Sequence, residues 1–172
     1  FEHINLSNSD FRRANFDTAK ISDVDFTQAN LSYTNLAGND LTGTSLVGAN
    51  LFGAILTGVD LSGKDLTGTI LTGADLSGYD LTGTILTGAD LSNIILTGVD
   101  LSGKDLTGTK LAGVDLSGKD FTGTIITEAD LSNTILTGVD LSGKDLTGTM
   151  FVGVDLSNVD LTDTILTGTD FT

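Results

Sequence analysis

Large apolar residues recur at every fifth position of this chain, from Phe1 and Leu6 through Leu61 and Phe121 to Phe171. The series contains no polar residue and no insertion. A period of five matches neither the turn of an α-helix, about 3.6 residues, nor the alternation of an extended strand. The pattern therefore predicts one short local structure that is repeated along the whole chain.

The polar residues follow the same period, so each group of five residues can be described by five slots. These slots hold a small residue, an acid or amide, the large apolar centre, a hydroxyl residue and a glycine. All 22 glycines occupy the fifth slot. Glycine tolerates positive φ, and the side chain of Asp or Asn can accept a hydrogen bond from the backbone of a turn. Each pentad is therefore predicted to form a short extended side followed by a corner.

A longer repeat is superimposed on the pentads. Residues 59–69 recur letter for letter at 99–109 and at 139–149, a spacing of 40 residues. Four pentads would close a square coil, and coils about 4.8 Å apart would pair their backbones as in parallel β-structure. A repeat of two whole coils would keep every residue on its own face of such a stack.

Residues 74–78 (Ala-Asp-Leu-Ser-Gly) and 89–93 (Ala-Asp-Leu-Ser-Asn) resemble the pentapeptide repeat family, whose pattern is Ala-Asp/Asn-Leu-x-x. The resemblance covers residues 1–172 and implies an all-β solenoid. That solenoid is a right-handed quadrilateral parallel β-helix of about nine coils of 20 residues, with the first-slot and centre side chains inside. We interpret residues 1–172 as a single β-helix domain, excised or trimmed from a longer chain.

Composition restricts the classes of partner. The net charge of −15 and the pI near 4.1 argue against direct binding of nucleic acid or of an anionic membrane, and favour a basic protein surface. No apolar run is long enough for a membrane span. The chain has no Cys, so the redox compartment stays open, with the cytoplasm slightly favoured.

One second-slot column, taken at every twentieth residue, consists only of carboxylates. We call it the acidic ladder, and it comprises Asp40, Asp60, Asp80, Asp100, Asp120, Asp140 and Asp160. Each Asp is expected to cap its own corner. The column is also the candidate interaction site for a basic partner. A row of cations is a weaker alternative, because one Asp in each coil supplies too few ligands for calcium.

A regular column of threonines raises the alternative of ice binding. It comprises Thr67, Thr87, Thr107, Thr127, Thr147 and Thr167. The second-slot column beside it alternates between acid and isoleucine, as at Asp65 and Ile85, which spoils a uniform surface. The isoleucines of this slot are expected to be exposed, and a partner could cover them.

Four lysines occupy the first slot, which should point inward: Lys64, Lys104, Lys119 and Lys144. A buried ammonium without a carboxylate is costly. We predict that the aliphatic stems pack at the wall while the ammonium groups extend outward, towards second-slot Asp residues. A pocket around these lysines that binds an anion is the alternative.

Nothing in the pattern indicates catalysis. The single histidine, His3, has no nucleophile or metal ligand beside it, and no inserted loop builds a cleft. We therefore predict a non-enzymatic, rigid, acidic scaffold without cofactor, catalytic residue or metal site, able to form an end-to-end homodimer through its open ends. Resemblance to fluoroquinolone-resistance members of the family implies a second reading, a DNA mimic that acts on a type II topoisomerase (gyrase).

Overall fold

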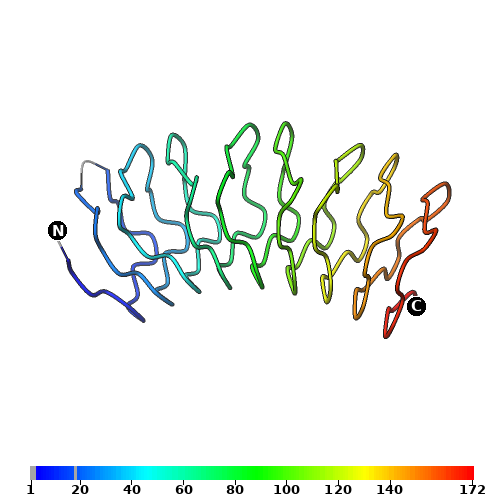
Figure 1. The fold of residues 1–172 in the computed structure, drawn as a ribbon. Coiled ribbons are helices and arrows are strands. Elements are labelled where there is room, and N and C mark those ends of the chain that lie inside the picture. Colours follow the sequence, from blue (N-terminus) through cyan, green and yellow to red (C-terminus); the bar gives the residue numbers. More distant parts are fainter. Residues whose placement is uncertain (1–2, 18) are drawn as a thin grey trace.

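The chain winds into a rod of stacked coils, with its two ends at opposite ends of the rod (Figure 1). The structure is a computed structural model, and it describes residues 3–17 and 19–172. The described residues form no helix and no extended strand. Their straight segments pair instead through isolated parallel bridges between residues 20 positions apart, such as Asp10 with Asn30. The predicted coil length and parallel pairing are therefore confirmed.

A corner combines a side-chain cap, a backbone hydrogen bond that closes the turn, and a residue with positive φ. The Oδ1 atom of Asn15 accepts a hydrogen bond of 2.9 Å from the backbone N–H of Asp17. The N–H of Ala14 donates to the carbonyl of Phe11 at 2.9 Å and closes the turn. All described residues with positive φ stand in the fifth slot, including Glu128 at 59°. The predicted corner is thus confirmed.

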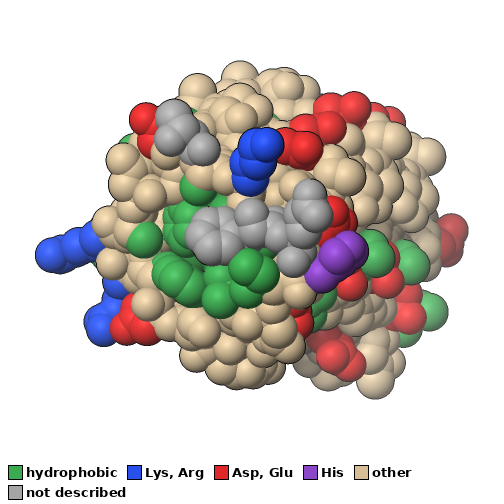
Figure 2. Space-filling view, turned by 90° about the vertical axis from the view of Figure 1, so that its left-hand side faces the viewer, with side chains coloured by type: hydrophobic (Ala, Val, Ile, Leu, Met, Phe, Trp, Pro, Cys, Tyr) green, Lys and Arg blue, Asp and Glu red, His purple; other side chains and the backbone are tan. Residues whose placement is uncertain are grey.

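The core follows the centre slot along the axis of the rod. Leu66, Leu106 and Leu146 are completely buried, as are most of their equivalents. At the N-terminal end, the rings of Phe11, Phe16 and Phe26 pack edge to face, with centroids 5.7 to 5.8 Å apart. Figure 2 looks onto this end, where hydrophobic side chains gather at the centre and charged ones at the periphery.

The second-slot side chains lie in four columns, one on each face of the square coil, and we number the faces in chain order. Face 1 runs from Asn5 to Ile165, face 2 from Asp10 to Asp170, face 3 from Asn15 to Asp155, and face 4 carries the acidic ladder from Asp40 to Asp160. These faces differ in how their backbones pair, although their sequences follow one pattern.

Face 2 is the continuous spine of the rod, because each of its second-slot residues from Asp10 to Asp170 is bridged to the next. Faces 1 and 3 are bridged at two successive steps at the N-terminal end, up to Ser45 and Ile55, and only at alternate steps beyond them. On face 1, for example, Asp65 is bridged to Ile85, but Ile85 is not bridged to Asp105. Along the acidic ladder, the one bridge among residues 3–17 and 19–172 joins Asp140 to Asp160.

Coils therefore come in pairs. Residues 61–80 and 81–100 are bridged on faces 1, 2 and 3, which we call a tight gap, whereas 81–100 and 101–120 are bridged only on face 2, which we call a loose gap. The same alternation on faces 1 and 3 continues towards the C-terminus, where the loose gap between residues 121–140 and 141–160 has the face 4 bridge in addition. The 40-residue repeat of the sequence is thus a pair of coils in the structure.

Long polar side chains in the first slot explain which gaps are loose. Lys64, Tyr79, Lys104 and Lys119 each donate a hydrogen bond across a loose gap to a backbone carbonyl of the preceding coil. Lys144 does the same to the carbonyl of Thr124 at 3.0 Å. Tight gaps have Val, Thr or Asn at these first-slot positions. The longer side chains hold neighbouring coils apart.

The four lysines attract second-slot carboxylates as predicted, Lys64 for example contributing, after the hydrogen bonds from Thr42, to the lowered pKa of Asp40, but their hydrogen bonds go to backbone carbonyls. All four are half-buried at the wall. In the described ranges, however, ion pairs join only Arg12 to Asp10 and Lys110 to Asp90. The lysines donate to carbonyl oxygens because these oxygens keep a free lone pair where the backbones of two coils are not bridged. Leu41 O, for instance, accepts only from Thr44 N and Lys64 Nζ.

Candidate interaction surface

All seven Asp residues of the acidic ladder are exposed on face 4. The Oδ1 atom of each accepts the backbone N–H two residues further on, at 2.7 to 2.9 Å. The expected capping role is therefore confirmed for every member. Because the cap fixes one carboxylate oxygen of each residue, the column presents its charges in a regular, preorganised row.

The same hydrogen bonds lower the pKa values of ladder carboxyls. The hydroxyl of Thr42, followed by its backbone N–H, lowers the pKa of Asp40 below the ordinary value. Asp60, Asp80, Asp120 and Asp160 are lowered by equivalent bonds, and for Asp100 the backbone N–H of Ser102 is the larger cause. These groups are fully ionised at neutral pH.

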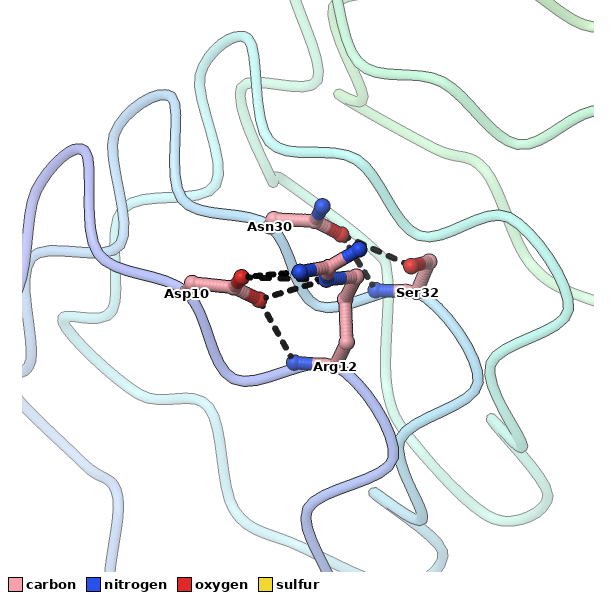
Figure 3. A network of polar contacts seen from close by, with 4 residues as sticks. All are labelled: Asp10, Arg12, Asn30 and Ser32. Carbon is pink, nitrogen blue, oxygen red and sulfur yellow. Dashed lines mark hydrogen bonds and ion pairs between the residues drawn. The ribbon is translucent and has the colours of Figure 1, made fainter.

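The cap itself does not require a charge. Asp10 accepts the N–H of Arg12 at 3.1 Å, and Asn30 in the next coil accepts the N–H of Ser32 at the same distance (Figure 3). Arg12 adds an ion pair of 2.7 Å to Asp10. Since an amide oxygen fills the same place as a carboxylate oxygen, charge and corner geometry can be separated by Asp→Asn substitution.

The open backbone along the ladder is bridged by first-slot side chains from both edges of face 4. Thr84 Oγ1 donates to Leu61 O at 2.8 Å, and Thr124 Oγ1 donates to Leu101 O at 3.0 Å. The ladder step with a backbone bridge, between Asp140 and Asp160, has Thr164 beside it, whose hydroxyl bonds to Leu161 within its own coil. Side-chain bonds thus replace backbone bonds on this face.

Shallow grooves between coils open beside the first-slot lysines. One on face 4 is lined by Asp40, Asp60 and Lys64, and another by Asp120, Asp140 and Lys144. The first groove has two carboxylates and one ammonium group, and the second, which Lys119 also lines, has two of each. Neither groove therefore has the excess of positive charge that would favour an anion.

The threonine column does not form a uniform hydroxyl surface. The hydroxyls of Thr107 and Thr147 donate to the Asp two residues before them at 2.6 Å. The second-slot isoleucines face water, as expected: Ile85 and Ile125 on face 1 and Ile95 on face 3 are each about half exposed. The ordered array that ice binding needs is interrupted at every second coil.

The sequence analysis missed the grooves of face 3. There Ile55 and Asp75 line one groove together with Tyr79, and Ile95 and Asp115 line a second together with Lys119. The alternation of Ile and Asp is visible in the sequence, but no residue pattern shows which steps between coils lack a backbone bridge.

Metal sites and membrane spans are two further classes of feature. Within residues 3–17 and 19–172, no three His, Cys, Asp or Glu side chains are grouped as metal ligands would be. The described part of the chain also contains no helix that could cross a membrane. End-to-end association into a homodimer and the interpretation of residues 1–172 as a single domain stay predictions.

Comparison with known proteins identifies the repeat. A family model described as pentapeptide repeats matches the chain in eight copies, at residues 1–28, 19–58, 56–88, 71–103, 80–111, 105–143 and 145–172. A search of the curated proteins gave no match.

Among solved structures, the chain is similar to trypsin-treated QnrB1, a plasmid-mediated fluoroquinolone resistance protein, with 19% identity over 98% of this chain and 90% of that chain and a TM-score of 0.52. It is also similar to HetL, which is involved in heterocyst differentiation regulation in the cyanobacterium Nostoc sp. strain PCC 7120, with 28% identity over 99% and 88% of the two chains and a TM-score of 0.32. The likeness to QnrB1 confirms the predicted right-handed quadrilateral β-helix.

Proposed function

The chain belongs to the pentapeptide repeat family, and on that premise we propose that it is a non-enzymatic, rigid, acidic scaffold that binds a basic protein surface. The acidic ladder is the proposed contact. Members of this family are generally binding proteins rather than enzymes, and a net charge of −15 attracts a basic partner.

One observation carries the proposal: seven exposed carboxylates lie in a single column, each held by its own corner. A fixed row of charge binds a complementary row with less loss of side-chain entropy than scattered charges do. Lys20 precedes the column in the same register, so the acidic stretch begins at Asp40.

A charge-matched pair of variants tests the role of the column. In the ladder variant, all seven ladder residues are changed from Asp to Asn. In the control, the same change is made at Asp25, Asp65, Asp90, Asp105, Asp130, Asp145 and Asp170 on faces 1 and 2. Both variants have the same net charge and keep an amide cap at each altered corner.

The probe is a labelled oligolysine, and binding is measured by fluorescence anisotropy at several salt concentrations. The ladder variant should lose at least about tenfold more affinity than the control, since seven aligned partners are removed at once. Equal losses would mean that net charge alone governs binding, and would refute the ladder as a site.

The similarity in fold to QnrB1 and the acidic surface favour a second candidate, a DNA mimic that acts on a type II topoisomerase such as gyrase. An exposed carboxylate column on a rod is chemistry that a DNA-binding protein surface can recognise. A gyrase supercoiling assay tests this candidate. Inhibition by the unaltered protein that is lost in the ladder variant supports it, whereas no inhibition at micromolar protein excludes it.

A further inference from the structure

Face 3 carries an apolar and acidic pattern that neither the ladder nor the core explains. Its second-slot residues alternate along the rod, with isoleucine on one side and aspartate on the other side of each loose gap. The three pairs are Ile55 with Asp75, Ile95 with Asp115, and Ile135 with Asp155. The three isoleucines are 51%, 49% and 53% exposed.

Two of these gaps open into grooves at the surface. The groove at Ile95 and Asp115 has a volume of about 470 Å³, and the groove at Ile55 and Asp75 about 340 Å³. The step from Ile135 to Asp155 likewise lacks a backbone bridge. Every groove therefore presents an apolar wall and a carboxylate wall to a side chain that enters it.

Apart from Tyr79 and Lys119, the residues of face 3 that follow the isoleucines and aspartates of these grooves are small. The fourth-slot residues from Thr57 to Ser157 are Thr or Ser, and the fifth-slot residues from Gly58 to Gly138 are glycine. Ser117 N–H binds Oδ1 of Asp115 at 2.9 Å, and no hydrogen bond within residues 3–17 and 19–172 engages the Oδ2 atom of Asp75, Asp115 or Asp155. A second acceptor oxygen on each carboxylate is thus free for a donor from a partner.

The chemistry selects a long basic side chain. A Lys or Arg can lay its aliphatic stem on the isoleucine and direct its charged group to the aspartate. A second copy of this chain does not supply such a surface, because it has eight Lys and Arg against 23 Asp and Glu.

The spacing selects an α-helix. The grooves recur every two coils, about 10 Å along the rod at about 4.8 Å for each coil. One heptad of an α-helix rises about 10.5 Å and returns to nearly the same face. Three residues of an extended strand cover a similar length, but their side chains point to opposite faces.

We propose that face 3 docks a basic amphipathic α-helix of a partner protein, which lies along the rod and places one Lys or Arg of each heptad in each Ile–Asp groove. The proposal concerns a different face from the acidic ladder and does not depend on it. Face 1 shows a similar alternation but is less suited. It has only two such loose gaps, at Ile85 and Ile125, and a lysine, Lys104 or Lys144, lies at each.

The probe is a labelled synthetic peptide of three heptads, helical by circular dichroism, with one Lys and one adjacent Leu at fixed heptad positions. Its matched control has the same composition and helicity, with the lysines distributed around the helix. The heptad peptide should bind at least about tenfold more tightly by fluorescence anisotropy. Equal affinity for the two peptides would overturn the proposal.

Protein variants locate the peptide. The substitutions Asp75→Asn, Asp115→Asn and Asp155→Asn, made together, should weaken binding at least about tenfold, whereas Asp65→Asn, Asp105→Asn and Asp145→Asn on face 1 should change it less than about threefold. Each set removes three charges and retains the corner caps. An equal loss for the face 1 set, or for Asp60→Asn, Asp100→Asn and Asp140→Asn on the ladder, would refute docking on face 3.

A single substitution tests whether binding of the heptad peptide can also be strengthened. Lys119 lies in the central groove and repels an incoming cation, whereas the equivalent position of the neighbouring groove is Tyr79. Lys119→Tyr copies that neighbour and keeps a hydroxyl for the carbonyl of the preceding coil. It should tighten binding of the heptad peptide by about threefold, and weaker binding would contradict the proposal.

Discussion

At the scale of single residues, the second and fifth slots decide the corner. An Asp or Asn in the second slot accepts the N–H two residues on, and the fifth-slot residue adopts a φ between about 54° and 75°. Positive φ disfavours residues with a Cβ atom, so a non-glycine residue in this slot is strained. Glu128 is such a case, and Gly88 occupies the same place one repeat earlier.

This pair gives a stability prediction. Segments 87–109 and 127–149 differ at only two positions, so the backgrounds match closely. Glu128→Gly should raise the free energy of unfolding by about 1 kcal/mol, and Gly88→Glu should lower it by a similar amount. A Cβ at Gly88 meets no atom within 4 Å, so φ alone is tested there.

Chemical denaturation measures both values. Glu128→Gln serves as the control, because it removes the charge and keeps the strained φ. If that control gains as much stability as Glu128→Gly, charge rather than backbone strain is responsible.

At the scale of the coil, the first slot decides how neighbouring coils meet. Thr in this slot bonds to the preceding coil across a tight gap, as Thr124 does to Leu101 O at 3.0 Å. Lysine and tyrosine reach the same kind of carbonyl through a longer side chain, and the gaps they cross are loose on faces 1 and 3. Backbone hydrogen bonds are therefore distributed unevenly among the four faces.

Amide hydrogen exchange should reveal this unevenness. On face 2, the N–H of Leu91 donates to Lys110 O at 2.7 Å and that of Leu111 to Asp130 O at 2.8 Å. On face 4, the N–H groups of Leu101 and Phe121 have no backbone acceptor. The face 4 amides should exchange at least roughly tenfold faster by NMR. Equal protection would show that the ladder face is closed in solution.

At the scale of the whole molecule, the continuous spine on face 2 opposes the open, acidic face 4. The negative charges of the rod lie at its surface. Their mutual repulsion is offset by the corner hydrogen bonds that lower the pKa values of the carboxyls. Stability at neutral pH therefore depends on these groups being ionised.

The sign of the pH dependence follows from linkage. The ladder carboxyls with lowered pKa values stabilise the fold fully above their ordinary value of 3.8, and this contribution is lost as the pH falls through the lowered folded values. The melting temperature, followed by circular dichroism, should be nearly constant from pH 7 to about pH 5 and fall below about pH 4.

The ladder variant, with Asn at all seven positions, should show a smaller fall, because it no longer has these groups to protonate. A melting temperature that rises on acidification would indicate that relief of charge repulsion outweighs the corner bonds, contrary to this prediction.

The sequence predicted the coil, its parallel stacking and the corner geometry, because each depends on contacts within one pentad or on strict periodicity. Leu61 and Leu66 are buried, and Asp60 caps its corner, as their slots require. Prediction missed the hydrogen-bond acceptors of Lys64 and Lys119, since a carbonyl left free by an open step has no signature in the sequence.

By itself, then, the sequence determined what every slot does: which side chains are inside, where the chain turns, and that the carboxylates of face 4 form one column. Only the tertiary structure decided which steps between coils close. Whether a gap is tight or loose depends on how two stacked first-slot side chains share the space between their coils. The competition between a bulky side chain and a backbone hydrogen bond arises only after the coils are stacked.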